Sequence, residues 1–127
     1  MKWSEAIPAL SVLNERCNMD DKIKKIRELN DNLRQNFTGG RVLITRGVAE
    51  LPIDKQLEIT EKVCNFSDFN KDNDPNGEHD FGAFDVDGIT YFWKIDYDDV
   101  EYQYLSLDPS DETITNRVLT IMLAEEY

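Results

Sequence analysis

The stretch that decides the fold is GAFDVDGITYFWKI, residues 82–95. Two runs with alternating apolar side chains flank Asp87-Gly88, a dipeptide that favours a two-residue hairpin turn because both central residues of a type I′ turn need positive φ. A turn of this length fixes the pairing of the two strands, and side chains opposite each other share one face of the sheet. The predicted cross-strand pairs are Val86 with Ile89, Phe84 with Tyr91 and Gly82 with Trp93.

Upstream of the hairpin, the sequence predicts a helix, a strand and a second helix. Apolar residues recur at steps of three and four after Asp20, which can act as an N-cap, and Gly39-Gly40 ends this amphipathic pattern. Residues 41–45 are rich in β-branched residues and predict a strand. Pro52 suits the first turn of a second helix that ends near Phe66. The inner faces of the two helices are predicted to carry Ile23, Ile26, Leu29 and Leu33, and then Ile53, Leu57, Thr60 and Cys64.

Downstream of the hairpin, residues 100–107 predict a further strand, and Asp108-Pro109 supply an N-cap and a first helical residue for a closing helix. The core face of that helix is predicted to carry Ile114, Val118, Ile121 and Met122. The expected fold is an α+β two-layer sandwich, an antiparallel sheet of about four strands with helices packed on one face. The other face of the sheet is a candidate binding surface. Residues 1–19 are expected to be an N-terminal appendage with a short helix after Pro8, and residues 20–127 a single domain.

The composition of the 127-residue chain restricts the possible partners. It has 26 acidic and 14 basic residues and a net charge of −12, so its surface repels nucleic acid, whose binding depends on neutralising phosphates with Lys and Arg. The same charge favours basic protein surfaces, including grooves that hold nucleic acid. Cys17 and Cys64 match no metal or redox motif and are expected to be reduced thiols. The first residues do not resemble a secretory signal and no run is long enough to span a membrane, so a cytoplasmic location in a bacterial host is expected.

The loop ahead of the hairpin concentrates groups that bind metal ions. The segment Asp72-x-Asp74-x-Asn76-Gly77 matches the front of an EF-hand calcium loop, but its twelfth position, which should be a bidentate Glu, is Ala83. An imidazole among carboxylates suits zinc or manganese better than calcium. The candidate ligands for one divalent ion are Asp72, Asp74, Glu78, His79 and Asp80.

The same loop has two other interpretations. In a purely structural one, the Asp and Asn side chains accept hydrogen bonds from nearby backbone amides, and His79 anchors the loop to nearby carboxylates. In a catalytic one, His79 acts as a general acid or base that Asp80 or Glu78 orients, beside a metal-bound water. No Ser or Cys lies next to His79 in the sequence, so nucleophilic catalysis gains no support.

A second acidic group follows the hairpin. Such a group can be a solvated surface that prevents edge-to-edge aggregation, or it can imitate the phosphates of nucleic acid and occupy a basic groove. Tyrosines nearby are candidate interface anchors, since Tyr is enriched at binding hot spots. The candidate partner-binding residues are Asp85, Asp96, Tyr97, Asp98, Asp99, Glu101 and Tyr102.

From Ile26 onward the chain resembles a bacterial family known as the domain of unknown function numbered 3768. The segments that carry the resemblance are residues 26–31, 42–48, 72–82, 93–97 and 117–124, so that it extends over about residues 23–127. The resemblance implies no particular activity, cofactor or catalytic residue. Such domains occur on plasmids and phage-derived elements, where small acidic proteins can serve as anti-restriction or anti-CRISPR inhibitors.

Together these observations favour a non-enzymatic acidic inhibitor that binds the basic nucleic-acid-binding surface of a defence nuclease, with a structural metal ion in the Asp72–Asp80 loop as an additional expectation. A small metal-dependent hydrolase centred on His79 is the first alternative, and an adaptor domain unrelated to nucleic acid is the second. Neither the partner nor the oligomeric state follows from the sequence.

Overall fold

In this computed structural model, the backbone is described for residues 8–127 and the side chains for residues 19–127. The elements in chain order are α2 (Pro8–Asn36), β1 (Arg41–Ile44), α3 (Arg46–Ala49), α4 (Ile53–Cys64), β2 (Phe81–Val86), β3 (Ile89–Asp98), β4 (Asn116–Leu123) and the 3₁₀ helix η1 (Ala124–Glu126). Within residues 8–127, no helix combines the length and the apolar character that a membrane span requires.

The four strands form one sheet in the order β1-β4-β3-β2. The β2–β3 hairpin has the predicted register, with Val86 opposite Ile89, Phe84 opposite Tyr91 and Gly82 opposite Trp93. Strand β4 pairs antiparallel with β3 and parallel with β1. The predicted α+β class is therefore confirmed, but the sheet is mixed, because one of its strand pairs is parallel.

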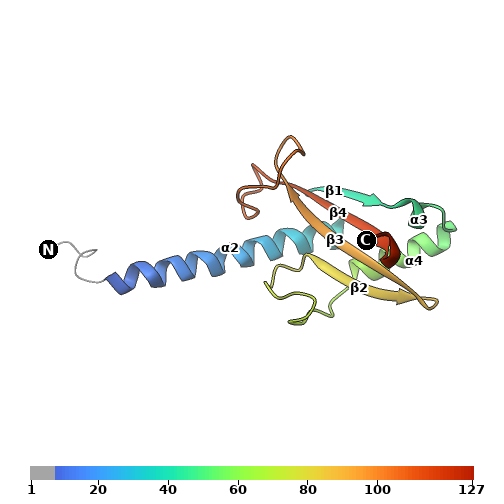
Figure 1. The fold of residues 1–127 in the computed structure, drawn as a ribbon, viewed down its shortest axis with the longest axis horizontal. Coiled ribbons are helices and arrows are strands. Elements are labelled where there is room, and N and C mark those ends of the chain that lie inside the picture. The colour runs from blue at the N-terminus through green and yellow to red at the C-terminus, as the bar shows by residue number, and fades with distance from the viewer. Residues whose placement is uncertain (1–7) are drawn as a thin grey trace.

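The core lies between the helices and one face of the sheet. Leu33 of α2 and Val63 of α4 pack with the strand residues Trp93 and Leu119, and all four side chains are fully buried. The C-terminal part of α2 lies against the sheet, whereas its N-terminal part extends past the strands (Figure 1). The loop after β3 lies outside this core, and many of its side chains are exposed.

The prediction of a closing helix is wrong, because residues 116–123 form β4, one of the two central strands of the sheet. Both faces of this strand are buried: Leu119 faces the helices and lies opposite Ile95, while Val118 and Met122 lie on the other face and are 8% and 3% exposed. A strand that is buried on both faces reads as a continuous apolar run, which periodicity alone cannot distinguish from a buried helix.

The predicted strand at residues 100–107 is also absent, and a loop joins β3 to β4 there. A single bridge between Asp98 and Leu105 is the only remnant of strand pairing within this loop. The Asp99 carboxylate accepts hydrogen bonds from the backbone amides of Glu101 and Gln103 at 3.1 and 3.0 Å. These bonds close a local turn that competes with an extended conformation.

The helices differ from prediction in extent and orientation. Helix α2 is continuous from Pro8, so Asp20 lies inside it and is not an N-cap; residues 1–7 lie outside the described part. In α4 the buried residues are Ile59 and Val63, whereas the predicted inward residues Ile53 and Leu57 are 68% and 65% exposed. Ile59 and Val63 face the sheet because they pack in the core cluster with Trp93 and Leu119.

Candidate functional site

The loop between α4 and β2, which carries the predicted metal ligands, is docked on helix α2. Arg27 Nε donates to the carbonyl of Gly77 at 2.9 Å, and Asn30 Nδ2 donates to the carbonyl of Glu78 at 3.0 Å. Both donors lie on one face of α2, three residues apart, as a helix places them. Backbone carbonyls of the loop are therefore held by long-range contacts that no local sequence pattern reveals.

His79 is the centre of this docked loop. Its Nδ1 lies 2.8 Å from Asp31 Oδ1 on α2, and its Nε2 lies 3.6 Å from Asp74 Oδ2 within the loop. The ring stacks on Phe69 with a centroid distance of 3.7 Å, and the backbone amide donates to Asp74 Oδ1 at 3.0 Å. The imidazole is thus enclosed by two carboxylates and an aromatic ring, an arrangement that anchors the loop.

Glu78 belongs to a second polar network beneath the loop. The Tyr97 hydroxyl donates to Glu78 Oε2 at 3.1 Å and accepts from Asn30 Nδ2 at 2.8 Å, while Arg117 Nε donates to Asn30 Oδ1 at 2.8 Å. Burial raises the pKa of Glu78 and of Tyr97 and lowers the pKa of Arg117. Burial also raises the pKa of Asp80, with a contribution from the nearby Asp74. This network ties α2 to β3 and β4.

The five predicted metal ligands do not face one common point. Asp72 is exposed, and its amide takes part in a turn closed by Asn70 Oδ1. Asp74 bonds to His79, and Glu78 bonds to Tyr97. In the part of the chain that the structure describes, no group of three or more His, Cys, Asp or Glu side chains is placed to hold a metal ion. Metal binding by this loop stays a prediction.

The predicted partner-binding residues divide between two faces and two ends of the sheet. Asp96 lies opposite Val118 on the face away from the helices, where its carboxylate is 3.1 Å from Lys94 Nζ. Tyr97 lies on the helix-facing side and uses its hydroxyl internally. Asp85 lies opposite Thr90, and the rise of a strand puts Thr90 roughly 26 Å from Asp98 along β3. Asp85 is therefore separated from the carboxylates at the far end of β3.

Those remaining carboxylates surround a projecting apolar segment that we call the Asp98–Leu107 loop. Its exposed apolar side chains are Val100, Tyr102, Tyr104, Leu105 and Leu107, which are 59%, 40%, 74%, 78% and 96% exposed. Asp98, Asp99 and Glu101 supply its acidic groups. The loop projects from the end of the sheet where β3 leads into β4 (Figure 1).

Several contacts hold the Asp98–Leu107 loop in shape. The amide of Asp99 donates to the carbonyl of Tyr104 at 2.8 Å, and the amide of Ser106 donates to the carbonyl of Tyr97 at 2.9 Å. The guanidinium of Arg41 lies 4.1 Å from the centroid of the Tyr102 ring. The apolar side chains are therefore presented on an ordered loop, which lowers the conformational entropy lost on binding.

The sequence predicted that the acidic residues of this loop bind a partner, but it assigned Leu105 and Leu107 to a strand. A signal was present at Asp99, because Asp favours turns in which its carboxylate accepts bonds from backbone amides ahead of it. The partners of His79 gave no such signal. Asp31 lies 48 residues away in sequence, and only the docking of α2 against the loop brings the two side chains together.

Comparison with family models matches residues 44–126 to one family, described as Protein of unknown function (DUF3768). No curated protein and no solved structure matches the sequence.

Proposed function

The chain belongs to the DUF3768 family, and we propose that it is a non-enzymatic binding protein whose Asp98–Leu107 loop docks on the basic nucleic-acid-binding surface of a bacterial defence nuclease. The observation that carries this proposal is the exposure of Tyr104, Leu105 and Leu107 beside carboxylates on one ordered loop. Exposed apolar side chains rimmed by polar groups are typical of protein interaction sites. Aromatic side chains are further enriched where such sites bind tightly.

Charge supports the choice of partner. A protein with a net charge of −12 is steered towards basic surfaces and away from nucleic acid. Grooves that bind single strands combine basic side chains with aromatic platforms on which bases stack. A loop that presents carboxylates together with tyrosines matches both features of such a groove. The proposed site of action is the cytoplasm of a bacterial host.

The geometry around His79 gives no support to the alternative of a metal-dependent hydrolase. A general base must reach the proton that it removes. Here the two ring nitrogens face Asp31 and Asp74, and one face of the ring is covered by Phe69. This arrangement supports an anchoring role for His79.

The proposal can be tested in cells that restrict incoming DNA. The protein is expressed in strains that carry different CRISPR or restriction nucleases, and the transformation efficiency of a targeted plasmid is measured. We expect the wild-type chain to raise this efficiency in at least one strain. The double variant Asp98→Lys/Glu101→Lys should lose the effect, because it reverses two side-chain charges while keeping the Asp99 carboxylate and the backbone amides that bond to it. Asp54→Lys/Glu61→Lys on α4 is the matched control and should retain it.

Binding to the affected nuclease can then be measured directly with purified proteins. We expect affinity to fall as salt rises, and the nucleic-acid substrate to compete with the protein. Tyr104→Ala/Leu107→Ala should weaken binding at every salt concentration, since it removes apolar contacts. Affinity that is independent of salt, or charge-reversed protein that binds normally, would contradict the proposal. A partner that does not bind nucleic acid would instead identify an adaptor.

A further inference from the structure

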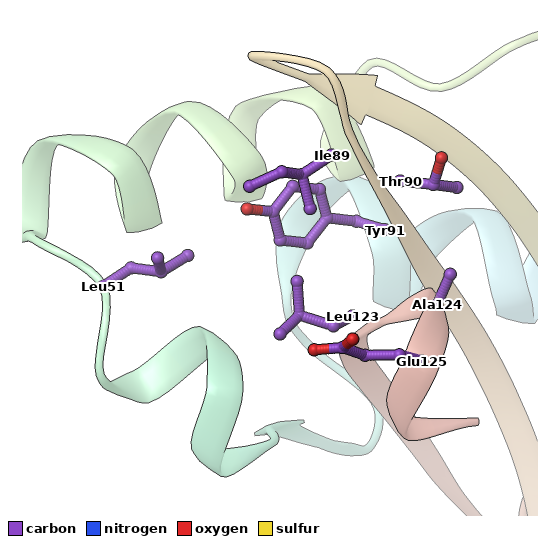
Figure 2. A pocket seen from close by; sticks show the side chains of 7 residues that line it. All are labelled: Leu51, Ile89, Thr90, Tyr91, Leu123, Ala124 and Glu125. Atoms are coloured by element: carbon purple, nitrogen blue, oxygen red, sulfur yellow. The ribbon is translucent and has the colours of Figure 1, made fainter.

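A hollow of about 410 Å³ lies at the hairpin end of the sheet, at the end of β3 away from the Asp98–Leu107 loop. Leu51, from the connection between α3 and α4, forms one side of it. Ile89 and Tyr91 at the start of β3 and Leu123 at the end of β4 form the other side (Figure 2). Three separate parts of the chain therefore supply its apolar wall, and its volume is at the lower end of the range for ligand sites.

Tyr91 gives this hollow a polar group that the protein itself does not use. The residue is only 3% exposed, and its ring stacks on Phe84 with a centroid distance of 5.8 Å. Its hydroxyl points into the hollow, towards Leu51 (Figure 2), and forms no hydrogen bond with any residue that the structure describes. The hydroxyl is not one of the fully buried polar atoms that lack a partner, so it stays accessible to solvent and to a ligand that enters the hollow.

The charge at the hollow selects the kind of ligand. Glu125 of η1 lines its rim, and its carboxylate lies beside Leu123 in Figure 2. None of the described residues that line the hollow is basic. A net charge of −12 adds to the local preference for cations and against anions.

We propose that this hollow binds a small organic amine with an apolar body. The body packs between Leu51 and Leu123, the ammonium group donates to the Tyr91 hydroxyl oxygen, and the Glu125 carboxylate at the rim adds electrostatic attraction. This site is independent of the proposed docking loop, since the two share no residue and lie at opposite ends of β3.

The experiment uses the ¹⁵N-labelled full chain and three probes of similar shape: phenethylamine, the neutral 2-phenylethanol and the anionic 3-phenylpropanoate. We expect phenethylamine to give saturable amide shifts around Leu51, Tyr91 and Leu123. The alcohol should bind more weakly, and the carboxylate should not bind. Tyr91→Phe should weaken amine binding about two- to tenfold, the range for loss of one hydrogen bond. Glu125→Gln should weaken it up to about fivefold, as for an exposed ion pair.

Glu61→Gln on α4 removes the same charge outside the hollow and should bind the amine as the wild type does. Melting curves show whether Tyr91→Phe folds. If Tyr91→Phe does not fold, the exposed position Glu125 still tests the proposal, because Glu125→Gln should fold normally. No shifts at millimolar amine, equal binding of all three probes, or unchanged binding by both variants would each overturn the proposal.

Discussion

At the scale of single residues, close packing around Trp93 leaves no space at Gly82. Trp93 is fully buried in the core, and Gly82 lies opposite it in the hairpin. A Cβ on Gly82 would collide with Trp93 Nε1 and would lie 2.8 Å from Phe66 Cζ. The glycine is therefore required for close approach, and the size of the neighbouring side chain is what excludes a methyl group.

Gly82→Ala is expected to lower the free energy of unfolding by about 1–3 kcal/mol, the range for overpacking in a core. Urea denaturation followed by tryptophan fluorescence measures this change. Ala83→Ser, at the exposed neighbouring position on the other face, is the control and should stay within about 0.5 kcal/mol of the wild type. Equal stability of Gly82→Ala and the wild type would show that the indole can move away from the hairpin.

Glu78 leads to a prediction for the pH dependence of stability. Burial raises the pKa of this carboxyl in the folded state above its ordinary value of 4.5. A raised pKa means that protonation favours folding, so the contribution is present below about pH 4.5 and lost as pH rises through the folded-state value. Glu78→Gln cannot titrate, and its side-chain oxygen can still accept the bond from Tyr97.

We therefore expect Glu78→Gln to melt at a higher temperature than the wild type at pH 7, with the difference shrinking towards pH 4. Scanning calorimetry across this range measures it. Glu61→Gln on the surface of α4 controls for the loss of one negative charge. A difference that is constant with pH would mean that burial of Glu78 does not govern its contribution.

At the scale of elements, the two candidate sites lie on loops that are held in place by contacts with helices and strands. The loop before β2 has no regular structure, yet Asp31 of α2 and Phe69 enclose His79, which has a φ of +56°. The Asp98–Leu107 loop depends in the same way on its bonds to the end of β3. Long loops that keep a defined shape need such external anchors.

His79→Ala is expected to lower the free energy of unfolding by about 1–3 kcal/mol, because it removes the contact with Asp31 and the stacking on Phe69. Asp72→Ala in the same loop, at an exposed position, should change it by less than about 0.5 kcal/mol. Melting curves of the wild type with and without chelator test the predicted metal ion separately. A stoichiometric metal, together with destabilisation by chelator, would establish the predicted metal loop, whereas unchanged stability of His79→Ala would contradict the anchoring role.

At the scale of the whole molecule, excess negative charge opposes the compact state. With 26 acidic and 14 basic residues, repulsion between carboxylates exceeds the attraction from pairs such as Arg46 with Glu50. Salt screens both terms, with a Debye length that falls from about 30 Å at 0.01 M to about 4–5 Å at 0.5 M. The larger repulsive term should therefore decrease more.

We expect the melting temperature to rise by several degrees between about 0.01 and 0.5 M sodium chloride. The charge-neutralised variant Glu61→Gln/Asp54→Asn should show a smaller rise, since it carries less repulsion. A melting temperature that falls with salt would mean that ion pairs outweigh the net charge.

Much of the fold could be predicted because local chemistry determines it. Asp87-Gly88 specifies its hairpin through backbone geometry alone, and the register that follows is confirmed. β4 could not be assigned in this way, because its buried faces depend on β1 and β3, which the chain brings together only on folding. Two predicted partner-binding residues show the same limit of prediction from sequence. Asp85 lies at the far end of the hairpin from the Asp98–Leu107 loop, and Tyr97 uses its hydroxyl inside the domain; both facts follow only from the assembled sheet.

The sequence by itself determined the hairpin, the α+β class, the family and the strongly acidic character, because turn geometry, apolar patterning and charge are properties of the chain. Only the tertiary structure decided which apolar residues remain exposed, which carboxylates gather beside them and what surrounds His79. These features depend on contacts between residues far apart in sequence, such as Asp31 with His79 and Asn30 with Arg117, and such contacts exist only when helices and strands pack together.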